Sequence, residues 1–184
     1  MCPSQLHSVQ HQDDLLMFLK KMQINQRHKI LDSLHDPNKN KISKSDCIII
    51  SDYDKGFLSI SDIELIFMHK KRNAKIFLDT KKNIPEQIFR VVNYLKLNEK
   101  EYNSISEYNR ANYRDKIIAT LGENGACYNN VYFQVKSPKN TIDVSGAGDT
   151  FMAAFVVSYV KNKDMDVSIR FANHCSGIVI QKRG

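Results

Sequence analysis

Cysteines are scarce in this sequence, and none is spaced as metal ligands usually are. The four cysteines stand at positions 2, 47, 127 and 175, with no CxxC pair and no histidine at zinc-finger spacing. This spacing argues against a structural metal site and against a disulfide framework. Reduced thiols are typical of the cytosol, so we expect a cytoplasmic protein.

Long apolar runs and a signal peptide are also absent from the sequence. The longest strongly apolar run has about ten residues, which is too short to span a bilayer. The stretch MCPSQLHSVQHQDD at the N-terminus lacks the charged start and the apolar segment of a signal peptide. We therefore expect no membrane partner.

The charge balance is basic, but it is not organised as a nucleic-acid site. A formal net charge of +7 suits an anionic partner such as a nucleotide, a sugar phosphate or a nucleic acid. The lysines are scattered in ones and twos, without a basic stripe or a nucleic-acid motif. We interpret them as a solvated surface and expect no nucleic-acid partner. The apolar fraction of 42% is sufficient for a buried core.

Residues 1–45 form a poorly defined N-terminal region. Helical spacing of Leu15, Phe18, Leu19 and Met22 predicts a helix there. The stretch HDPNKNKISKSD after it predicts an exposed loop.

Short apolar runs and helical patterns alternate after residue 45. CIIIS, AKIFLDT, VVNYLKLN and DKIIATLG read as strands buried on both faces of a sheet. SISDIELIFMHKKR, with Ser59 or Ser61 as its N-cap, and EKEYNSIS predict helices. This alternation is typical of an α/β fold with a mostly parallel sheet and helices on its faces.

The last third of the chain predicts a hairpin and two helices. ACYNNVYFQVK is expected to turn at Asn129 and Asn130, which favour turn conformations. Two helices at about 149–162 and 165–181 then close the chain.

Polar segments follow the predicted strands and are expected to surround one pocket. Ligands of parallel sheets bind beyond the carboxyl ends of the strands. Asp52, Lys55 and Lys81 lie at such ends and would face a phosphate, although a solvated surface is the alternative for each lysine. The segments in question are SDYDKG, DTKK, NEKE, TLGENG and DVSGAGD.

The glycine-rich turn DVSGAGDT directly precedes the first of the two closing helices. The first turn of a helix presents backbone N–H groups that attract anions. Gly146 and Gly148 lack a Cβ, so a ligand oxygen can approach the backbone closely there. Asp149 follows them and can accept a proton from an attacking hydroxyl. The turn thus combines a phosphate cradle with a base, which is the machinery of phosphoryl transfer to an alcohol.

A structural alternative exists for this turn. Asp149 would then serve as a helix N-cap, a common role for aspartate. The turn also matches neither the P-loop pattern GxxxxGK[ST] nor GxGxxG.

DVSGAGDTF closely resembles the C-terminal signature D-T-x-G-A-G-D-x-F of the ribokinase-like (PfkB-type) carbohydrate kinases. NEKE resembles the family's N-x-x-E element, ATLGENGA its T-x-G-x-x-G-A turn, and FANHCSGIVIQKRG its closing A-N-x-x-x-A helix. All appear in the family's order over roughly residues 46–184. The resemblance implies a ribokinase-like, Rossmann-like three-layer α/β fold, truncated at its N-terminal side, and an ATP-dependent phosphotransferase that acts on a sugar or sugar-phosphate hydroxyl.

IIISDYDKGFL is most similar to one branch of this family, the heptose-7-phosphate kinases. These kinases read S-D-Y-x-K-G after the same strand and are often part of a bifunctional heptose kinase and adenylyltransferase. The resemblance implies a role in ADP-heptose synthesis for lipopolysaccharide.

The resemblance also assigns catalytic roles. Asp149 would be the base that activates the sugar hydroxyl. Gly146, Ala147 and Gly148 would donate backbone N–H bonds to the transferring phosphoryl group, in keeping with the electrostatic logic of phosphoryl transfer.

Further positions would bind the cofactors ATP and Mg²⁺. Asn98 and Glu101 would hold the Mg²⁺–phosphate region through waters. Their alternative is an Asn that ends a strand and a Glu that favours the first turn of a helix. Asp143 and the Ser145 carbonyl match positions that bind a monovalent cation such as K⁺ in some family members.

The resemblance places the nucleotide among four residues. Thr120, Gly122 and Gly125 would shape its pocket, with a tight turn between strands as their alternative. Asn173 would lie near the adenine, with an exposed polar position on a helix as its alternative.

Family members are considerably longer than this chain, which resembles little more than their C-terminal half. The Gly-Gly and Asn motifs that grip the sugar, and a small β lid, are not recognisable in residues 1–45. Three interpretations follow: a sugar kinase that needs an N-terminal half, an inactive nucleotide-binding remnant of a kinase, and a protein whose positive charge binds a nucleic acid. The lids of this family often dimerise, which makes a homodimer a further expectation.

Overall fold

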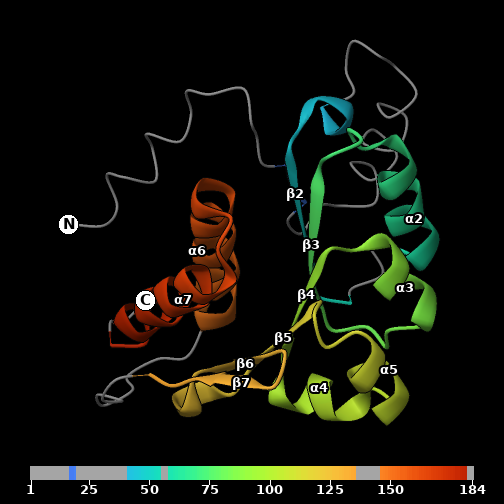
Figure 1. The fold of residues 1–184 in the computed structure, drawn as a ribbon. Helices are drawn as coiled ribbons and strands as arrows, with labels where there is room; N and C mark the ends of the chain where they lie inside the picture. The colour runs from blue at the N-terminus through green and yellow to red at the C-terminus, as the bar shows by residue number, and fades with distance from the viewer. Residues whose placement is uncertain (1–16, 20–40, 55–57, 136–145, 182–184) are drawn as a thin grey trace.

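One sheet organises the part of the chain that the structure describes. The structure is a computed structural model, and it describes residues 17–19, 41–54, 58–135 and 146–181. Seven strands of these ranges lie in the order β1-β2-β3-β4-β5-β6-β7 (Figure 1). The first five strands pair in parallel and the last two pair antiparallel. Their bounds are Met17–Leu19, Cys47–Asp52, Lys75–Thr80, Tyr94–Asn98, Ile117–Thr120, Ala126–Tyr128 and Val131–Phe133.

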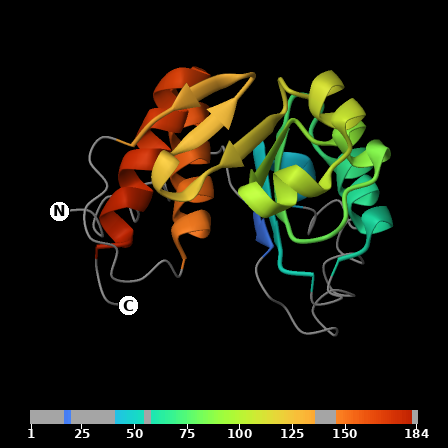
Figure 2. The ribbon, with the colours of Figure 1, turned by 90° about the horizontal axis from the view of Figure 1, so that it is seen from below.

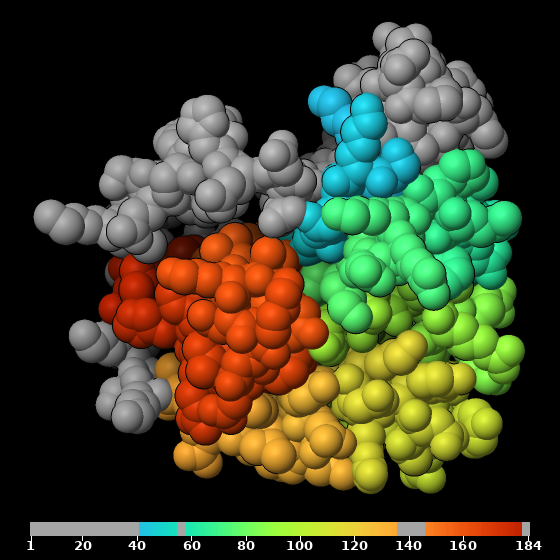
Figure 3. Space-filling model, turned by 45° about the horizontal axis from the view of Figure 1, so that its top comes forward, coloured from blue at the N-terminus to red at the C-terminus, as the bar shows by residue number. Residues whose placement is uncertain are grey.

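Helices cover both faces of the sheet, which gives three layers (Figures 1 and 2). One face carries four helices: α2 (Ile60–His69), α3 (Glu86–Val91), α4 (Glu99–Ser104) and α5 (Glu107–Asn112). The other face carries α6 (Ala147–Asn162) and α7 (Met165–Val179). In Figure 3 the orange residues of α6 form one side of the visible surface, and the green and yellow residues form the other. Among the described residues, no helix has both the length and the apolar character needed to cross a bilayer.

Each face of the sheet has its own hydrophobic core. Ile48 and Ile50 of β2 pack with the core under α2 and α3, whereas Cys47 and Ile49 pack with the core under α6. Successive side chains of a strand point to opposite faces, so a strand covered on both sides is apolar throughout. The continuous apolar run CIII is explained in this way, and the prediction of a strand buried on both faces is confirmed.

Local signals place several element ends where they were expected. Ser59 is the N-cap of α2, because its hydroxyl oxygen accepts from Asp62 N–H at 3.2 Å and Asp62 accepts from Ser59 N–H at 2.7 Å. The hairpin turns at Asn129 and Asn130, whose φ angles are 48° and 64°. Both angles are positive, as a two-residue hairpin turn requires.

The N-terminal part differs from its sequence prediction. Residues Met17–Leu19 form β1, which pairs in parallel with β2, so the predicted helix is wrong at these three residues. Leu15 and Met22 lie outside the described residues. The predicted exposed loop is also wrong at Ile42, which is 0% exposed and belongs to the core under α2.

Candidate active site

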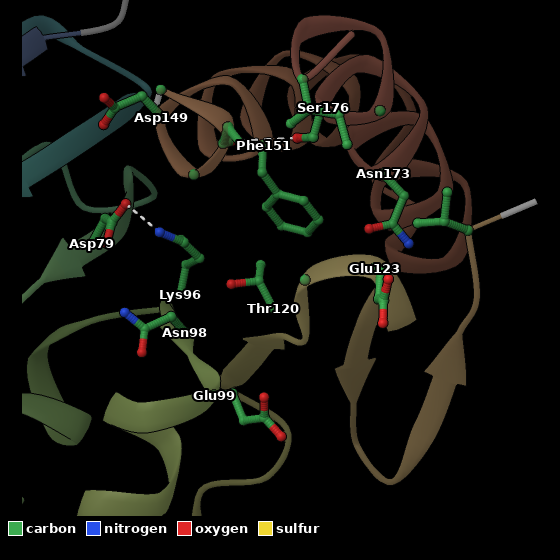
Figure 4. Close-up of a pocket in the computed structure, with 18 of the residues that line it drawn as sticks. Asp79, Lys96, Asn98, Glu99, Thr120, Glu123, Asp149, Phe151, Asn173 and Ser176 are labelled. Carbon is green, nitrogen blue, oxygen red and sulfur yellow. Dashed lines mark hydrogen bonds and ion pairs between the residues drawn. The ribbon is translucent and has the colours of Figure 1, made fainter. Parts of the chain in front are cut away.

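A cleft of about 1310 Å³ opens at the carboxyl ends of β2 to β5. The first turn of α6 and one face of α7 form its opposite wall (Figure 4). The predicted catalytic and nucleotide-binding residues all line this cleft, although they are spread over more than seventy positions of sequence: Asn98, Glu101, Thr120, Gly122, Gly125, Gly146, Ala147, Gly148, Asp149 and Asn173. Lys55, Asp143 and Ser145 lie outside the described residues. The functional roles of all these residues stay predictions.

The glycine turn leads into α6 without a side-chain cap. Gly146 is the N-cap in the left-handed region, with φ 76° and ψ −1°. The first hydrogen bond of the helix runs from Thr150 N–H to the Gly146 carbonyl at 2.8 Å. The amides of Ala147, Gly148 and Asp149 therefore precede the intrahelical ladder, at the positive end of the helix dipole. This geometry suits an anion.

Asp149 is the third residue of α6 and is not its N-cap, so the capping alternative is wrong. Its side chain instead meets the hydroxyl of Tyr53, which follows β2 directly. The hydroxyl oxygen lies 2.6 Å from Oδ1 and 2.5 Å from Oδ2 of Asp149. Burial, and then the hydrogen bond and charge of Asp149, raise the pKa of Tyr53 to about 12. The base predicted from the sequence thus faces an O–H donor.

Lys96 and Asp79 form an ion pair on the floor of the cleft (Figure 4). Lys96 Nζ lies 2.7 Å from Asp79 Oδ2, and the side chains are only 9% and 13% exposed. Burial raises the pKa of the Asp79 carboxyl although the Lys96 ammonium opposes this shift. A Cβ built on Gly148 would lie 2.8 Å from Lys96 Nζ, so the ammonium lies directly against the glycine turn. The ammonium is paired with the Asp79 carboxylate, so it adds a hydrogen-bond donor, and no net charge, at the anion-attracting end of α6.

Sequence reasoning placed the segments that contain Tyr53 and Asp79 around the pocket but gave neither residue a role, and it did not include Lys96. A signal for the ion pair was present, because each strand run contains one charged residue close to its carboxyl end. The pairing of β3 with β4 places Asp79 directly opposite Lys96. That register is not visible in the sequence.

Asp52 lines the cleft, but its carboxylate is bonded to neighbouring residues, and a contact with phosphate stays a prediction. Its side chain is 2% exposed and accepts from Lys82 Nζ at 2.5 Å and from Thr80 Oγ1 at 3.2 Å. Its other oxygen accepts from Asp54 N–H at 3.1 Å. The carboxylate therefore ties the end of β2 to the end of β3. Lys81 lines the cleft, with Nζ 5.7 Å from the centre of the Tyr53 ring.

Asn98 and Glu101 form a capping box at the start of α4. Glu101 N–H donates to Asn98 Oδ1 at 2.9 Å, and Asn98 N–H donates to Glu101 Oε2 at 2.7 Å. A third bond joins Asn98 Nδ2 to Glu101 Oε1 at 2.7 Å. The structural alternative for this pair therefore holds, and the box fixes both side chains at the cleft. A role toward Mg²⁺ through waters stays a prediction, and no group of three or more metal-ligating side chains occurs among the described residues.

The turn after β5 requires glycine for steric reasons. Gly122 has φ 58° with open space around it, whereas Gly125 has φ 87° and its added Cβ would lie 2.1 Å from the Phe133 carbonyl oxygen. Thr120, just before the turn, donates from Oγ1 to the Leu97 carbonyl at 3.2 Å. A tight turn between strands is therefore present, at the edge of the cleft.

Asn173 is a buried residue, so the exposed alternative for it is wrong. It is 7% exposed, and its Nδ2 donates to the Phe133 carbonyl at 2.7 Å. The same carbonyl limits the space at Gly125. Asn173 thus connects α7 to β7 beside the β5 turn.

Comparison with known proteins identifies the family. The description "pfkB family carbohydrate kinase" matches residues 25–184. The bifunctional protein HldE of a Nitratiruptor species is 28% identical over 160 residues, which are 78% of this chain and 34% of that protein. A 2-dehydro-3-deoxygluconokinase of Haemophilus influenzae is 35% identical over 75 residues, which are 38% of this chain and 24% of that protein. The chain spans about a third of the length of the HldE relative.

Solved structures show the same architecture. A ribokinase from Thermotoga maritima superposes with a TM-score of 0.65 at 21% identity, over 84% of this chain and 56% of that one. An adenosine kinase from Schistosoma mansoni in complex with 2-fluoroadenosine gives 0.66 at 20% identity, over the same shares of 84% and 56%. These likenesses establish a ribokinase-like fold. Because the family match covers most of the sequence, the chain belongs to the pfkB family of carbohydrate kinases.

Proposed function

We propose that this chain carries the phosphoryl-transfer side of an ATP-dependent carbohydrate kinase. The phosphoryl group would pass from ATP to a hydroxyl of a sugar or sugar phosphate. One observation carries the proposal: the Asp149 carboxylate, the first amides of α6 and the Lys96 ammonium meet in a single cleft. A base and an anion site must adjoin for this reaction, because catalysis of phosphoryl transfer consists mainly of positioning and charge stabilisation.

The residues present fit a nucleotide phosphate. Gly148 has no side chain at the point where the helix amides and the Lys96 ammonium converge. An anion there would meet donors from both α6 and β4, which is the arrangement expected of a preorganised oxyanion site. When bound, Mg²⁺ would neutralise phosphate charge, and Asn98 and Glu101, which line the cleft, would hold its region through waters. Thr120, Gly122, Gly125 and Asn173 would border the nucleoside.

Asp149 would accept the proton of the acceptor hydroxyl. The hydrogen bond from Tyr53 supports this assignment, since the Asp149 carboxylate already receives an O–H donor at 2.5–2.6 Å. That distance lies in the range required of a general base and its substrate proton. Transfer of the proton would leave an alkoxide-like oxygen to attack the phosphoryl group held at residues 146–148.

Heptose 7-phosphate is the acceptor that we infer. The stretch SDYDKG supports it through its similarity to the heptose-7-phosphate kinase branch. Two HldE proteins, from Nitratiruptor and Bradyrhizobium diazoefficiens, match 78% of the chain at 28% and 29% identity. We expect the protein to act in the cytoplasm on nucleotide and sugar substrates. A K⁺ site at Asp143 and a homodimer stay predictions.

The test is phosphate transfer from ATP labelled at the γ position. The chain is assayed alone and with the N-terminal half of an HldE kinase supplied as a second polypeptide. We expect label in heptose 7-phosphate and much less in fructose 6-phosphate. Label in neither sugar, with ATP binding intact in every combination, would overturn the proposal and indicate an inactive nucleotide-binding protein.

A further inference from the structure

The hydroxyl of Tyr53 contacts both carboxylate oxygens of Asp149. The hydroxyl is nearly equidistant from both Asp149 oxygens, at 2.6 and 2.5 Å. The two residues are 96 positions apart and come from different layers, the end of β2 and the start of α6. One O–H placed between two carboxylate oxygens restricts rotation of the carboxylate, because either rotation lengthens one of the two contacts.

The segment that carries Tyr53 is itself anchored. Asp52, the residue before it, receives donors from Lys82 and Thr80 of the neighbouring strand end. Asp54, the residue after it, donates its backbone N–H to Asp52 and its carboxylate lies 3.3 Å from Lys82 Nζ. These bonds fix the backbone on both sides of Tyr53, so the position of its hydroxyl beside Asp149 does not depend on a free loop. The buried Asp52 carboxylate thereby anchors the segment that carries Tyr53.

We propose that Tyr53 is the positioning residue of the catalytic base, holding the Asp149 carboxylate toward the cleft so that one oxygen is presented to the acceptor hydroxyl. The inference rests on the proposed function, since Asp149 must be the base for its position to matter in turnover. A carboxylate has about four lone-pair sites and Tyr53 supplies one proton. The remaining lone pairs of the carboxylate can therefore accept the acceptor hydroxyl while Tyr53 keeps its contact. No step of the reaction transfers a proton to or from Tyr53.

An NMR measurement that needs neither substrate nor turnover tests the contact between Tyr53 and Asp149 first. The chain is labelled with ¹³Cζ-tyrosine, and the Tyr53 resonance is assigned from its loss in Tyr53→Phe. We expect its shift to move in Asp149→Asn, because the hydroxyl then meets a neutral amide in place of a carboxylate. Tyr132, which is 68% exposed on β7, is the internal control and should be the same in both proteins. A Tyr53 resonance that ignores Asp149→Asn would overturn the proposal.

Kinetics of the chain, assayed together with the N-terminal half of an HldE kinase, then distinguish a positioning role of Tyr53 from a role in stability alone. Tyr53→Phe should lower kcat about 10-fold with little change in the KM for ATP, as expected for the loss of one hydrogen bond to a charged group. Loss of a positioning contact should therefore appear in kcat and leave the KM for ATP almost unchanged. An unchanged kcat would reject the positioning role. If Asp149→Asn retained full turnover while the resonance test succeeded, the assignment of Asp149 as the base would fail and the contact would stand.

Discussion

Asp149 is the residue whose replacement tests the chemistry most directly. Asp149→Asn keeps the size of the side chain but removes its ability to take a proton. We expect turnover to fall roughly 10²–10⁴-fold, the usual cost of losing a general base. Binding of ATP, measured by calorimetry, should be largely retained, because the cradle uses backbone amides. Glu107→Gln, at the exposed start of α5, is the control and should leave both quantities unchanged.

Lys96 is the residue whose loss should affect stability most clearly. Lys96→Met leaves the buried Asp79 carboxylate without its partner, and breaking such a pair costs roughly 3–5 kcal/mol of unfolding free energy at neutral pH. The pKa of Asp79 is already raised by burial, and without Lys96 it should rise further. A folded-state pKa above the unfolded one means that the folded state binds the proton more tightly. The destabilisation should therefore shrink as pH falls through the raised pKa of Asp79.

Urea unfolding at several pH values measures this effect. Lys100→Met, which replaces an exposed lysine at the edge of the same cleft, is the matched control. It should cost little at any pH. A Lys96→Met penalty that stayed constant or grew toward acid would contradict the assignment of the cost to the Asp79 charge.

At the scale of elements, signals that depend on neighbouring residues were readable from the sequence. The N-cap at Ser59 and the turn at Asn129–Asn130 follow from side chains a few positions apart. Short elements were harder to predict. Six residues show too little of a 3.6 period to identify a helix reliably, and α3 and α5 were not expected, whereas α4, of the same length, was predicted. The run around Phe18 matched helical spacing, yet pairing with β2 decides its conformation.

The β5 turn offers a prediction on how one element is built. Gly122→Ala should cost about 1–2 kcal/mol of unfolding free energy, the penalty for a left-handed residue in open space. Gly125→Ala should cost roughly 3 kcal/mol or more, since strain adds to a clash with the Phe133 carbonyl. Urea unfolding of the two variants compares positions three residues apart. Equal costs would show that the backbone of β7 moves and relieves the clash with the Phe133 carbonyl.

At the scale of the whole molecule, the site consists of contacts between layers, and the sequence did not show them. The glycine turn, the N-x-x-E element and the β5 turn could be located from their motifs, since each is local. The partners Tyr53–Asp149 and Asp79–Lys96 could not, because they depend on strand register and on how α6 lies against the sheet. The capping box at Asn98 illustrates the same limit, since its motif does not show whether local capping or Mg²⁺ binding fixes the residues.

The meeting of α6 with β4 gives the last prediction. Alanine in a helix is normally about 1 kcal/mol more favourable than glycine. At Gly148 the new Cβ would lie 2.8 Å from Lys96 Nζ, so Gly148→Ala should be neutral or destabilising in the wild type. In a Lys96→Ala background the space is clear, and the same change should become stabilising.

Gly177→Ala on α7, where nothing lies within 4 Å of the added Cβ, is the control and should be stabilising in both backgrounds. Unfolding free energies of the four proteins in the cycle measure the coupling, which we expect to be roughly 0.5–3 kcal/mol as for residues in contact. A coupling of zero would mean that the Lys96 side chain does not resist the new Cβ, and that the ammonium is not held firmly against the glycine turn.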